Sequence, residues 1–232
     1  MSKFTDLLCP GIFDQIINFL NSKELLKLIN TSKIFLFAKK KYFWNLNKTY
    51  SIQFYNDLEF RNRVLSVIET PNKYLALDLN RYREVRDVSV LANVHTLNLS
   101  GCKVTNVDAL CNAHTLYLSR CPIKDVRALS NVHTIDLSYC EVLKDIIGLS
   151  DVHTLNLSGC EISNVSMLGK VHTLNLSYCP ITDVSSLCNV HTLNISGCQV
   201  TDVSMLGKLH TLIIKWCPVQ DVSALGNVRI FR

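Results

Sequence analysis

A fixed period of 19 or 20 residues runs through the last two thirds of the chain and limits what it can fold into. All seven histidines occupy one position of this period, in steps of 19, 19, 20, 19, 19 and 19 residues: His95, His114, His133, His153, His172, His191 and His210. Seven of the ten cysteines keep the same steps: Cys102, Cys121, Cys140, Cys160, Cys179, Cys198 and Cys217. Such a period indicates stacked coils, each too small to fold alone, that share one continuous core.

The repeating unit reads H-T-L-x-L-S-x-C-x-(I/V)-x-(D/N)-V-x-x-L-x-x-V. Leu97 and Leu99 alternate with polar residues, which predicts a short strand with one buried face. Asn106 and its equivalents stand where a short side chain can accept backbone N–H bonds and start a tight helical turn. Glycine or asparagine in segments such as "LGNV" is expected to let the chain turn back toward the next strand.

The periodicity divides residues 75–232 into a divergent first coil at 75–94, seven full coils at 95–228 and a C-terminal stub. The first coil has Leu75 at the histidine position and Tyr82 at the cysteine position, and like the coil 133–152 it is one residue longer. An atypical first coil is expected, because its outer side meets a cap and not another coil.

The first third of the chain predicts helices. Apolar residues recur at helical spacing in 12–20, a second helix is expected after Asn21 or Ser22, and a third in "KIFLFAKKKYFWNL". The segment "NDLEFRNRVLSVIETPNK" predicts a further amphipathic helix that begins at Asn56 or Asp57, stops at Pro71 and covers the open edge of the first coil.

Charge and composition narrow the possible partners. Residues 1–74 hold 11 basic and 6 acidic side chains, whereas residues 75–232 hold 13 of each. The neutral repeats argue against a long nucleic-acid footprint. No apolar run reaches the ~18 residues that a membrane helix needs. Ten cysteines without an export signal predict a reducing compartment and free thiols.

The repeats resemble a known family. "VHTLNLSGCKV" matches the leucine-rich-repeat core L-x-x-L-x-L-x-x-(N/C)-x-L, and the cysteine is similar to that of the cysteine-containing repeats in F-box proteins. The tails "TDVSML" and "KDVRAL" resemble internalin-like repeats. The resemblance implies a curved solenoid with a parallel β-sheet on its concave side.

Residues 8–46 resemble an F-box. Ser32-Lys33 fits the family's serine-lysine pair, Phe35 stands for its tryptophan and Trp44 fits a later one, while Cys9 and Gly11 replace its proline and glutamate. The resemblance implies docking to a Skp-type adaptor of a cullin-based ubiquitin ligase. The residues expected to contact the adaptor are Leu8, Pro10, Ile12, Phe13, Ile16, Ile17, Leu20, Leu25 and Leu26. The whole chain is similar to proteins encoded by large DNA viruses of amoebae, which implies a cytoplasmic location, in the host if the protein is viral.

The histidine and cysteine columns invite a metal hypothesis, which the spacing disfavours. Zinc needs about four converging ligands, whereas like residues of neighbouring coils stack about 4.8 Å apart and point the same way. The thiols are therefore expected to be small buried residues with a weak S–H donor. A repeated titratable group indicates architecture, so neither a cofactor nor catalysis is expected.

Binding residues are sought among the positions that vary between coils. If the histidine is position one, positions two, four and six of each strand face the concave surface. Position four is asparagine in most coils but Tyr117 and Asp136 in two of them, and position seven varies more, among glycine, arginine, tyrosine and tryptophan. Tyrosine, tryptophan and arginine are the residue types that anchor interfaces. The target-binding candidates are Tyr117, Arg120, Asp136, Tyr139, Asn156, Tyr178, Asn194 and Trp216.

These observations predict an α/β chain with three parts: an F-box-like helical domain at 1–48, a connecting helix at 49–74 and a leucine-rich-repeat solenoid at 75–232. The predicted function is substrate recognition for a ubiquitin ligase, without chemistry of its own. Three alternatives stay open. The first is a scaffold whose N-terminal helices only cap the solenoid, the second a phosphatase-regulator-like or adhesin-like repeat protein, and the third a metal-storing histidine and cysteine ladder.

Overall fold

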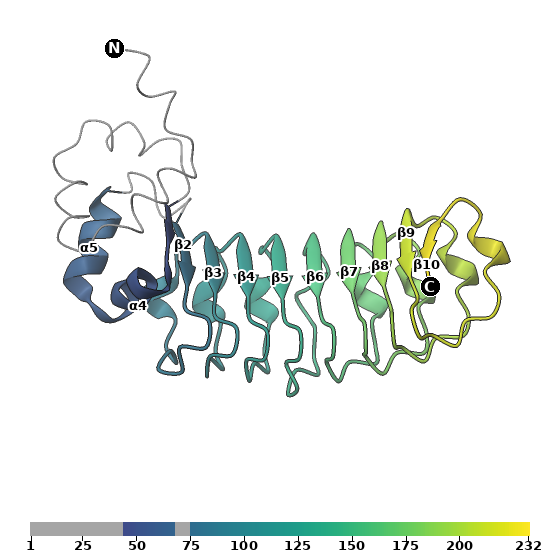
Figure 1. Ribbon diagram of the computed structural model, residues 1–232, viewed down its shortest axis with the longest axis horizontal. Coiled ribbons are helices and arrows are strands. Elements are labelled where there is room, and N and C mark those ends of the chain that lie inside the picture. Colours follow the sequence, from purple (N-terminus) through teal and green to yellow (C-terminus); the bar gives the residue numbers. More distant parts are fainter. Residues whose placement is uncertain (1–43, 68–74) are drawn as a thin grey trace, which may run out of the picture.

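The computed structural model describes residues 44–67 and 75–232 of the chain. Short parallel strands stand side by side in one ten-stranded sheet, whose order follows the sequence (Figure 1). The strands are β1 Trp44–Leu46, β2 Leu75–Asp78, β3 Thr96–Asn98, β4 Thr115–Tyr117, β5 Thr134–Asp136, β6 Thr154–Asn156, β7 Thr173–Asn175, β8 Thr192–Asn194, β9 Thr211–Ile213 and β10 Arg229–Phe231. The predicted coils and parallel sheet are confirmed.

Each coil buries the apolar positions that the pattern predicts. In the coil that begins at His153, the exposed fraction is 1% at Leu155, 0% at Leu157, 2% at Ile162 and 0% at Leu168. The register pairs each strand leucine with its equivalent in the next coil, for example Leu155 with Leu174. The repeated leucines, valines and cysteines thus form one continuous core along the sheet.

The chain turns opposite the sheet through single turns of 3₁₀ helix: η1 Ser89–Leu91, η2 Asp108–Leu110, η3 Arg127–Leu129, η4 Ser166–Leu168, η5 Ser185–Leu187, η6 Ser204–Leu206 and η7 Ser223–Leu225. The expected asparagine and aspartate caps are present. The Asp183 side chain accepts the backbone N–H of Ser185 at 2.9 Å, and Asn106 accepts that of Asp108 at 2.8 Å. The longer coil 133–152 has a turn at Ile147 and Gly148 in place of the 3₁₀ helix.

Glycine has two roles in the return turn. In the segment "LGNV", Gly226 has φ of +51°, so the expected backbone freedom is confirmed there. Gly169 and Gly207 have φ of −63°, which any residue adopts. A Cβ at Gly169 would lie 2.5 Å from the carbonyl oxygen of Ser186, and one at Gly207 would lie 2.8 Å from that of Ala224. Close approach of the next coil, and not backbone freedom, explains glycine at these two positions.

The open edge of the first coil is covered by α4 Lys48–Asn56, with α5 Leu58–Val67 packed against it (Figure 1). The Ser51 hydroxyl donates to the carbonyl of Leu46 at 2.9 Å and accepts the N–H of Asp78 at 2.9 Å, which ties the helix to β1 and β2. Tyr55 donates its hydroxyl to the carbonyl of Asp87 at 3.0 Å. The cap therefore bonds to both sides of the first coil.

Two expectations for the N-terminal third need correction. The third helix was expected to run to Leu46, but Trp44–Leu46 is a strand that pairs in parallel with Leu75–Leu77. Trp44, which the F-box resemblance matched, thus belongs to the sheet, because pairing with the first coil satisfies its backbone better than a helix end would. A helix also begins at Lys48, ahead of the expected one, whose start at Asp57 is confirmed by a 3.0 Å bond from the N–H of Phe60. The nine adaptor-contact candidates lie outside the described residues.

Candidate functional site

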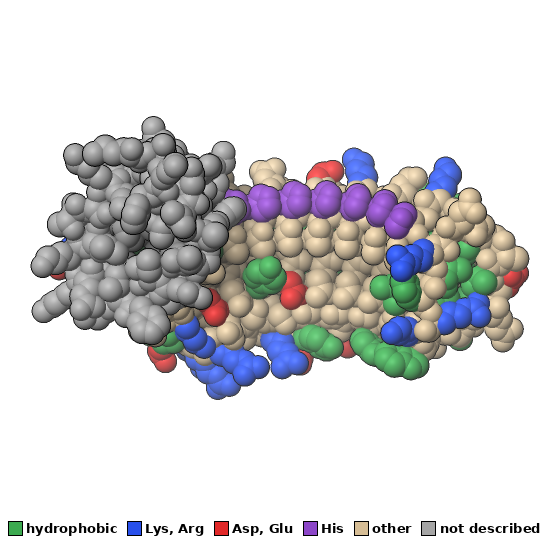
Figure 2. All heavy atoms as spheres, turned by 45° about the horizontal axis from the view of Figure 1, so that its top comes forward, with side chains coloured by type: hydrophobic (Ala, Val, Ile, Leu, Met, Phe, Trp, Pro, Cys, Tyr) green, Lys and Arg blue, Asp and Glu red, His purple; other side chains and the backbone are tan. Residues whose placement is uncertain are grey.

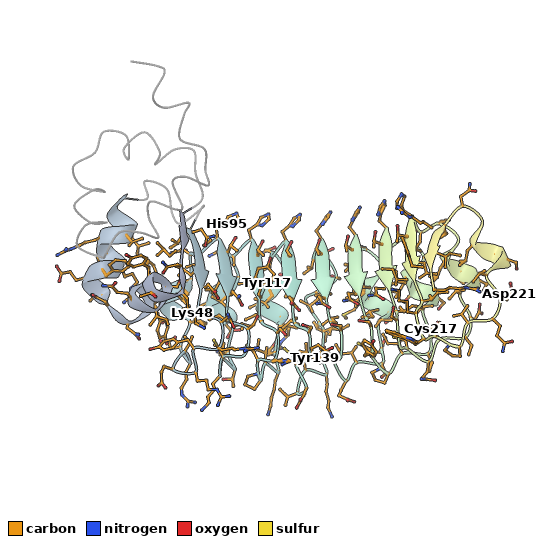
Figure 3. All side chains as sticks on the ribbon, viewed as in Figure 1. Lys48, His95, Tyr117, Tyr139, Cys217 and Asp221 are labelled. Carbon is orange, nitrogen blue, oxygen red and sulfur yellow. The ribbon has the colours of Figure 1, made fainter. Side chains whose placement is uncertain are left out.

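The seven histidines form a continuous stack along one edge of the sheet, here called the histidine ladder (Figure 2). Centroids of successive rings are 4.4–4.7 Å apart and the ring planes differ by 8–14°. The rings project from the sheet in a row that starts at His95 (Figure 3). The spacing expected from the strand separation is confirmed, and the rings lie outside the core.

Hydrogen bonds hold each ladder ring in the same orientation. The Nδ1 atom of every ladder histidine lies 2.9–3.2 Å from the Oγ1 atom of the threonine that follows it. The carbonyl of His153 accepts the N–H groups of both His172 and Thr173, at 3.1 and 3.0 Å, and the other coils repeat this arrangement. Backbone and side chain together therefore keep the rings parallel.

The cysteine ladder, Cys102 to Cys217 at position eight, runs inside the coils. Each thiol donates to a carbonyl oxygen at position five of the preceding coil, at 2.9–3.3 Å. Burial raises the pKa of the Cys121, Cys140 and Cys179 thiols to about 12 and that of Cys198 to about 11. The expectation of small buried residues with a weak S–H donor is confirmed.

We expect alkylation to distinguish these thiols. At about pH 8, iodoacetamide should modify the half-buried Cys111 and Cys188 of the folded protein long before Cys140 or Cys179, because only a thiolate is an efficient nucleophile. Peptide mass spectrometry of samples taken over time measures the order, and urea-unfolded protein is the control in which all these thiols react. Early modification of Cys140 would contradict the buried position of the ladder.

Position seven has an unusual backbone in every coil, with φ between +56° and +73°. Three of the eight residues are glycine, for which this conformation is unstrained. The other five are Arg81, Arg120, Tyr139, Tyr178 and Trp216. A residue with a Cβ loses about 1–2 kcal/mol in the left-handed region. These large residues are thus placed where a glycine would cost less. The name position-seven row is used here for Arg120, Tyr139, Tyr178 and Trp216, which occupy this position in the full coils.

Members of the position-seven row lean over the glycine of the next coil. A Cβ at Gly159 would lie 2.5 Å from Cδ1 of Tyr139, and one at Gly197 would lie 2.6 Å from Cδ1 of Tyr178. Beyond Gly197, the rings of Tyr178 and Trp216 come within 6.1 Å of each other. Gly159 and Gly197 therefore give space to the aromatic ring of the coil before them, and Gly101 lies in the same way beside the Arg81 side chain.

Arginine and tyrosine meet where two large residues are consecutive. The Arg120 guanidinium carbon lies 5.3 Å from the centroid of the Tyr139 ring, within cation–π range. These two side chains line a shallow depression of about 400 Å³ together with Cys121, Pro122, Glu141 and Val142. Tyr139, Tyr178 and Trp216 are 44%, 53% and 75% exposed, so the row presents large aromatic surface to solvent.

The position-four candidates lie on the sheet between the histidine ladder and the position-seven row. Tyr117 is exposed there (Figure 3). Asp136, Asn156 and Asn194 are half-buried, and each accepts the backbone N–H two residues ahead, at 2.9–3.1 Å. The Asn156 amide also donates to Asp136 at 3.0 Å. These three side chains therefore serve the strand ends, and Tyr117 is the position-four candidate with a free surface.

The structure thus brings Arg120, Tyr139, Tyr178 and Trp216 together in one row, which sequence reasoning selected by residue type alone. The sequence did not predict the left-handed backbone at position seven, nor that Tyr139 and Tyr178 pack over the glycine of the next coil. The recurrence of glycine at a position otherwise held by large residues was the signal from which both could have been found. Among the residues that the structure describes, no group of three or more histidine, cysteine or acidic side chains has the arrangement of a metal site. No helix within 44–67 or 75–232 is long and apolar enough to cross a membrane.

Comparison with known proteins supports the repeat assignment. A model described as "Leucine Rich repeat" matches residues 90–111, 170–185 and 186–206. A comparison with curated proteins gives no match. Among solved structures, internalin C2 from Listeria monocytogenes is 27% identical with a TM-score of 0.55, over 62% of this chain and 72% of that one.

Two further structures share the fold. The functional domain of InlJ from Listeria monocytogenes, which includes a cysteine ladder, is 20% identical with a TM-score of 0.52, over 68% of this chain and 37% of that one. The leucine-rich-repeat protein LIC12759 of Leptospira interrogans is 19% identical with a TM-score of 0.54, over 68% of this chain and 49% of that one. This chain thus spans less than two thirds of the length of these two neighbours.

Proposed function

Since its coils are leucine-rich repeats, forming an interaction scaffold, we propose that the protein captures a target protein through the position-seven row and Tyr117. The supporting observation is the row itself: Arg120, Tyr139, Tyr178 and Trp216 keep large exposed side chains on a backbone that favours glycine. Aromatic and arginine side chains dominate the binding energy of protein interfaces. Rings seated against the next coil also lose little freedom on binding, which favours affinity.

The finer proposal is that the captured target is a substrate of a cullin-based ubiquitin ligase. In this proposal the F-box-like residues 8–46 dock a Skp-type adaptor, and the repeats hold the target. The support is the resemblance of these residues to the F-box pattern, together with the cysteine at position eight, which is similar to that of repeats in F-box proteins. Binding would act by raising the effective concentration of the target near the ligase. Such a role belongs in the cytoplasm, where the thiols stay reduced.

A second candidate is a scaffold without a ligase, in which the N-terminal residues only close the solenoid. The cap favours it: β1 joins the sheet, and α4 bonds to the first coil through Ser51 and Tyr55. Trp44, at the end of the F-box resemblance, lies in that cap. The two candidates differ in whether residues ahead of Trp44 bind an adaptor.

Adaptor binding tests the ligase proposal. We expect the full chain to retain a purified Skp-type adaptor in a pull-down, and the double variant Ile16→Asp, Leu20→Asp to lose it, because a charged side chain would have to be desolvated in an apolar contact. The matched control is the five-site variant of the next paragraph, which should retain the adaptor. Absence of adaptor binding by the unmodified chain would leave the scaffold as the function.

Target binding tests the position-seven row. We expect alanine at Tyr117, Arg120, Tyr139, Tyr178 and Trp216 to weaken capture of the cellular target by roughly 100-fold or more, since two interface anchors suffice for that loss. Alanine keeps the Cβ at these positions, so the backbone strain is unchanged and the fold should persist. The control variant replaces the exposed Ile147, Met167 and Met205 by alanine. Equal capture by the wild-type chain and the five-site variant in quantitative mass spectrometry would refute the assignment of the binding surface.

A further inference from the structure

In six of the seven ladder histidines, the outer ring nitrogen has no hydrogen-bond partner among the residues that the structure describes. The Nδ1 atoms face the threonines, and no hydrogen bond to Nε2 is found for His114, His133, His153, His172, His191 or His210 within the described residues. All six side chains are exposed. Rings at 4.4–4.7 Å spacing therefore place their Nε2 groups in one straight line on the surface (Figures 2 and 3).

Protonation would turn this line into a dense row of positive charge. Histidine changes charge between about pH 5 and 8, and both ring nitrogens of the cation are donors. The rings are close enough for successive charges to repel one another. The pKa of His191 is lowered by desolvation and by the neighbouring charges of His172 and His210. Because adjacent charged rings would repel one another at this spacing, an anion laid along the ladder would relieve the repulsion.

The groups around the ladder favour an anion. The residues two places before the ladder histidines form a row beside the ladder. Its charged members are Asp151, Lys170 and Lys208, and the Lys170 amine lies 3.7 Å from a carboxylate oxygen of Asp151. In the last strand, Arg229 pairs with Thr211, next to the end of the ladder, and donates its N–H to the carbonyl of His210. On the strand side the ladder borders uncharged threonines. The nearest acids on the strands, Asp78 and Asp136, and the basic Lys215 lie at positions four and six.

We propose that the histidine ladder is a binding site for a linear chain of phosphate groups, occupied at mildly acidic pH and vacated at neutral pH. A phosphate offers several acceptor oxygens, so one group can accept from two adjacent imidazolium Nε2–H donors. Successive groups then continue along the ladder. Such charge-assisted bonds are stronger than those between neutral groups.

The surroundings favour inorganic polyphosphate over other polyanions. Sites for single-stranded nucleic acid combine positive charge with aromatic side chains on which bases stack. The residues that flank the ladder are threonine on one side and asparagine, aspartate and lysine on the other. An extended acidic peptide places carboxylates of one face almost 7 Å apart, which leaves part of a ladder with 4.4–4.7 Å spacing unpaired. A chain of phosphates has no bases that need stacking partners, and each group can accept from two adjacent rings, so it suits this narrow line of donors.

Binding of polyphosphate at two pH values tests the proposal. We expect the full chain to bind polyphosphate of defined length at least about tenfold more tightly at pH 5.5 than at pH 7.5 at constant salt, measured by fluorescence anisotropy. The triple variant His153→Asn, His172→Asn, His191→Asn should lose about tenfold in affinity at pH 5.5 and change little at pH 7.5. The control Lys103→Gln, Lys124→Gln, Lys144→Gln removes three exposed charges elsewhere and should weaken binding by less than about threefold.

A second measurement needs no variant. In an NMR titration of the wild-type histidine rings, polyphosphate should raise the apparent pKa of the ladder by about half a unit or more, because binding and protonation are linked. An unchanged titration, affinity that is the same at both pH values, or equal losses in the two triple variants would overturn the proposal. So would tighter binding of poly-glutamate or of single-stranded oligonucleotide of equal charge, which would assign the ladder to an acidic protein or to nucleic acid.

Discussion

Replacing Leu155 by alanine is expected to lower the free energy of unfolding by about 2–5 kcal/mol. Leu155 is 1% exposed in β6, and its register partners are Ile135 on one side and Leu174 on the other. The cavity would therefore open toward both neighbouring coils, and neither can shift toward it without breaking its own sheet pairing. Urea unfolding followed by far-ultraviolet circular dichroism measures the change.

The matched control for Leu155 is its neighbour in the same strand. Thr154→Ala removes a half-buried side chain from the face of the strand opposite to the core and should change the free energy of unfolding by less than about 0.5 kcal/mol. Because each coil contacts only adjacent coils, the Leu155 variant should also broaden the transition, as the two halves of the solenoid become less coupled. A loss below about 1 kcal/mol would mean that the strand leucines are not the shared core.

Replacing Gly148 by alanine is expected to cost about 2–5 kcal/mol, the sum of backbone strain and overpacking. Gly148 has φ of +97°, and a Cβ there would lie 2.8 Å from Cα and 2.9 Å from the carbonyl oxygen of Arg127. Both obstructing atoms belong to the backbone of the preceding coil, so no side-chain rotation can relieve the contact. The coil 133–152 would have to move away from its neighbour.

Gly226 is the control that separates strain from collision. It has φ of +51°, but a Cβ there would meet no atom within 4 Å. Its ψ is −110°, so Gly226→Ala should cost only the strain of this backbone conformation, about 1–3 kcal/mol. The difference between the two variants, measured by thermal and urea unfolding, reports the collision at Gly148. Equal losses would show that the extra residue of the longer coil leaves more room than the structure describes.

Much of the solenoid could be predicted because each coil repeats the same local code. Strand leucines such as Leu97 and turn caps such as Asn106 carry their signals within a few residues, and seven copies remove the ambiguity of any one. The N-terminal cap has no such redundancy. Trp44–Leu46 reads as a helix end by itself and becomes a strand because β2 offers it backbone partners. Local pattern could not reveal that partner, which is some thirty residues away.

In the candidate site, too, the sequence predicted some features and the tertiary contacts decided others. Residue type identified Tyr139, Tyr178 and Trp216 as interface anchors, but the sequence pattern placed Asp136, Asn156 and Asn194 beside them as equals. The structure shows that these three accept backbone N–H groups at the strand ends. A side chain that completes a turn and one that faces a partner look alike in a repeat, since both are polar and recur at a fixed position.

The amino-acid sequence by itself determined the period, the buried positions, the parallel order of the strands and the alignment of histidines and cysteines into columns. A short repeat can bury its leucines only by stacking, and stacking places equivalent residues above one another. Only the tertiary structure decided that the rings of the histidine ladder stack face to face, that position seven is left-handed, and that each seated aromatic ring needs the glycine of the next coil. These features arise from contacts between coils, where the distance between neighbouring backbones, and not the local pattern, determines which side chain fits.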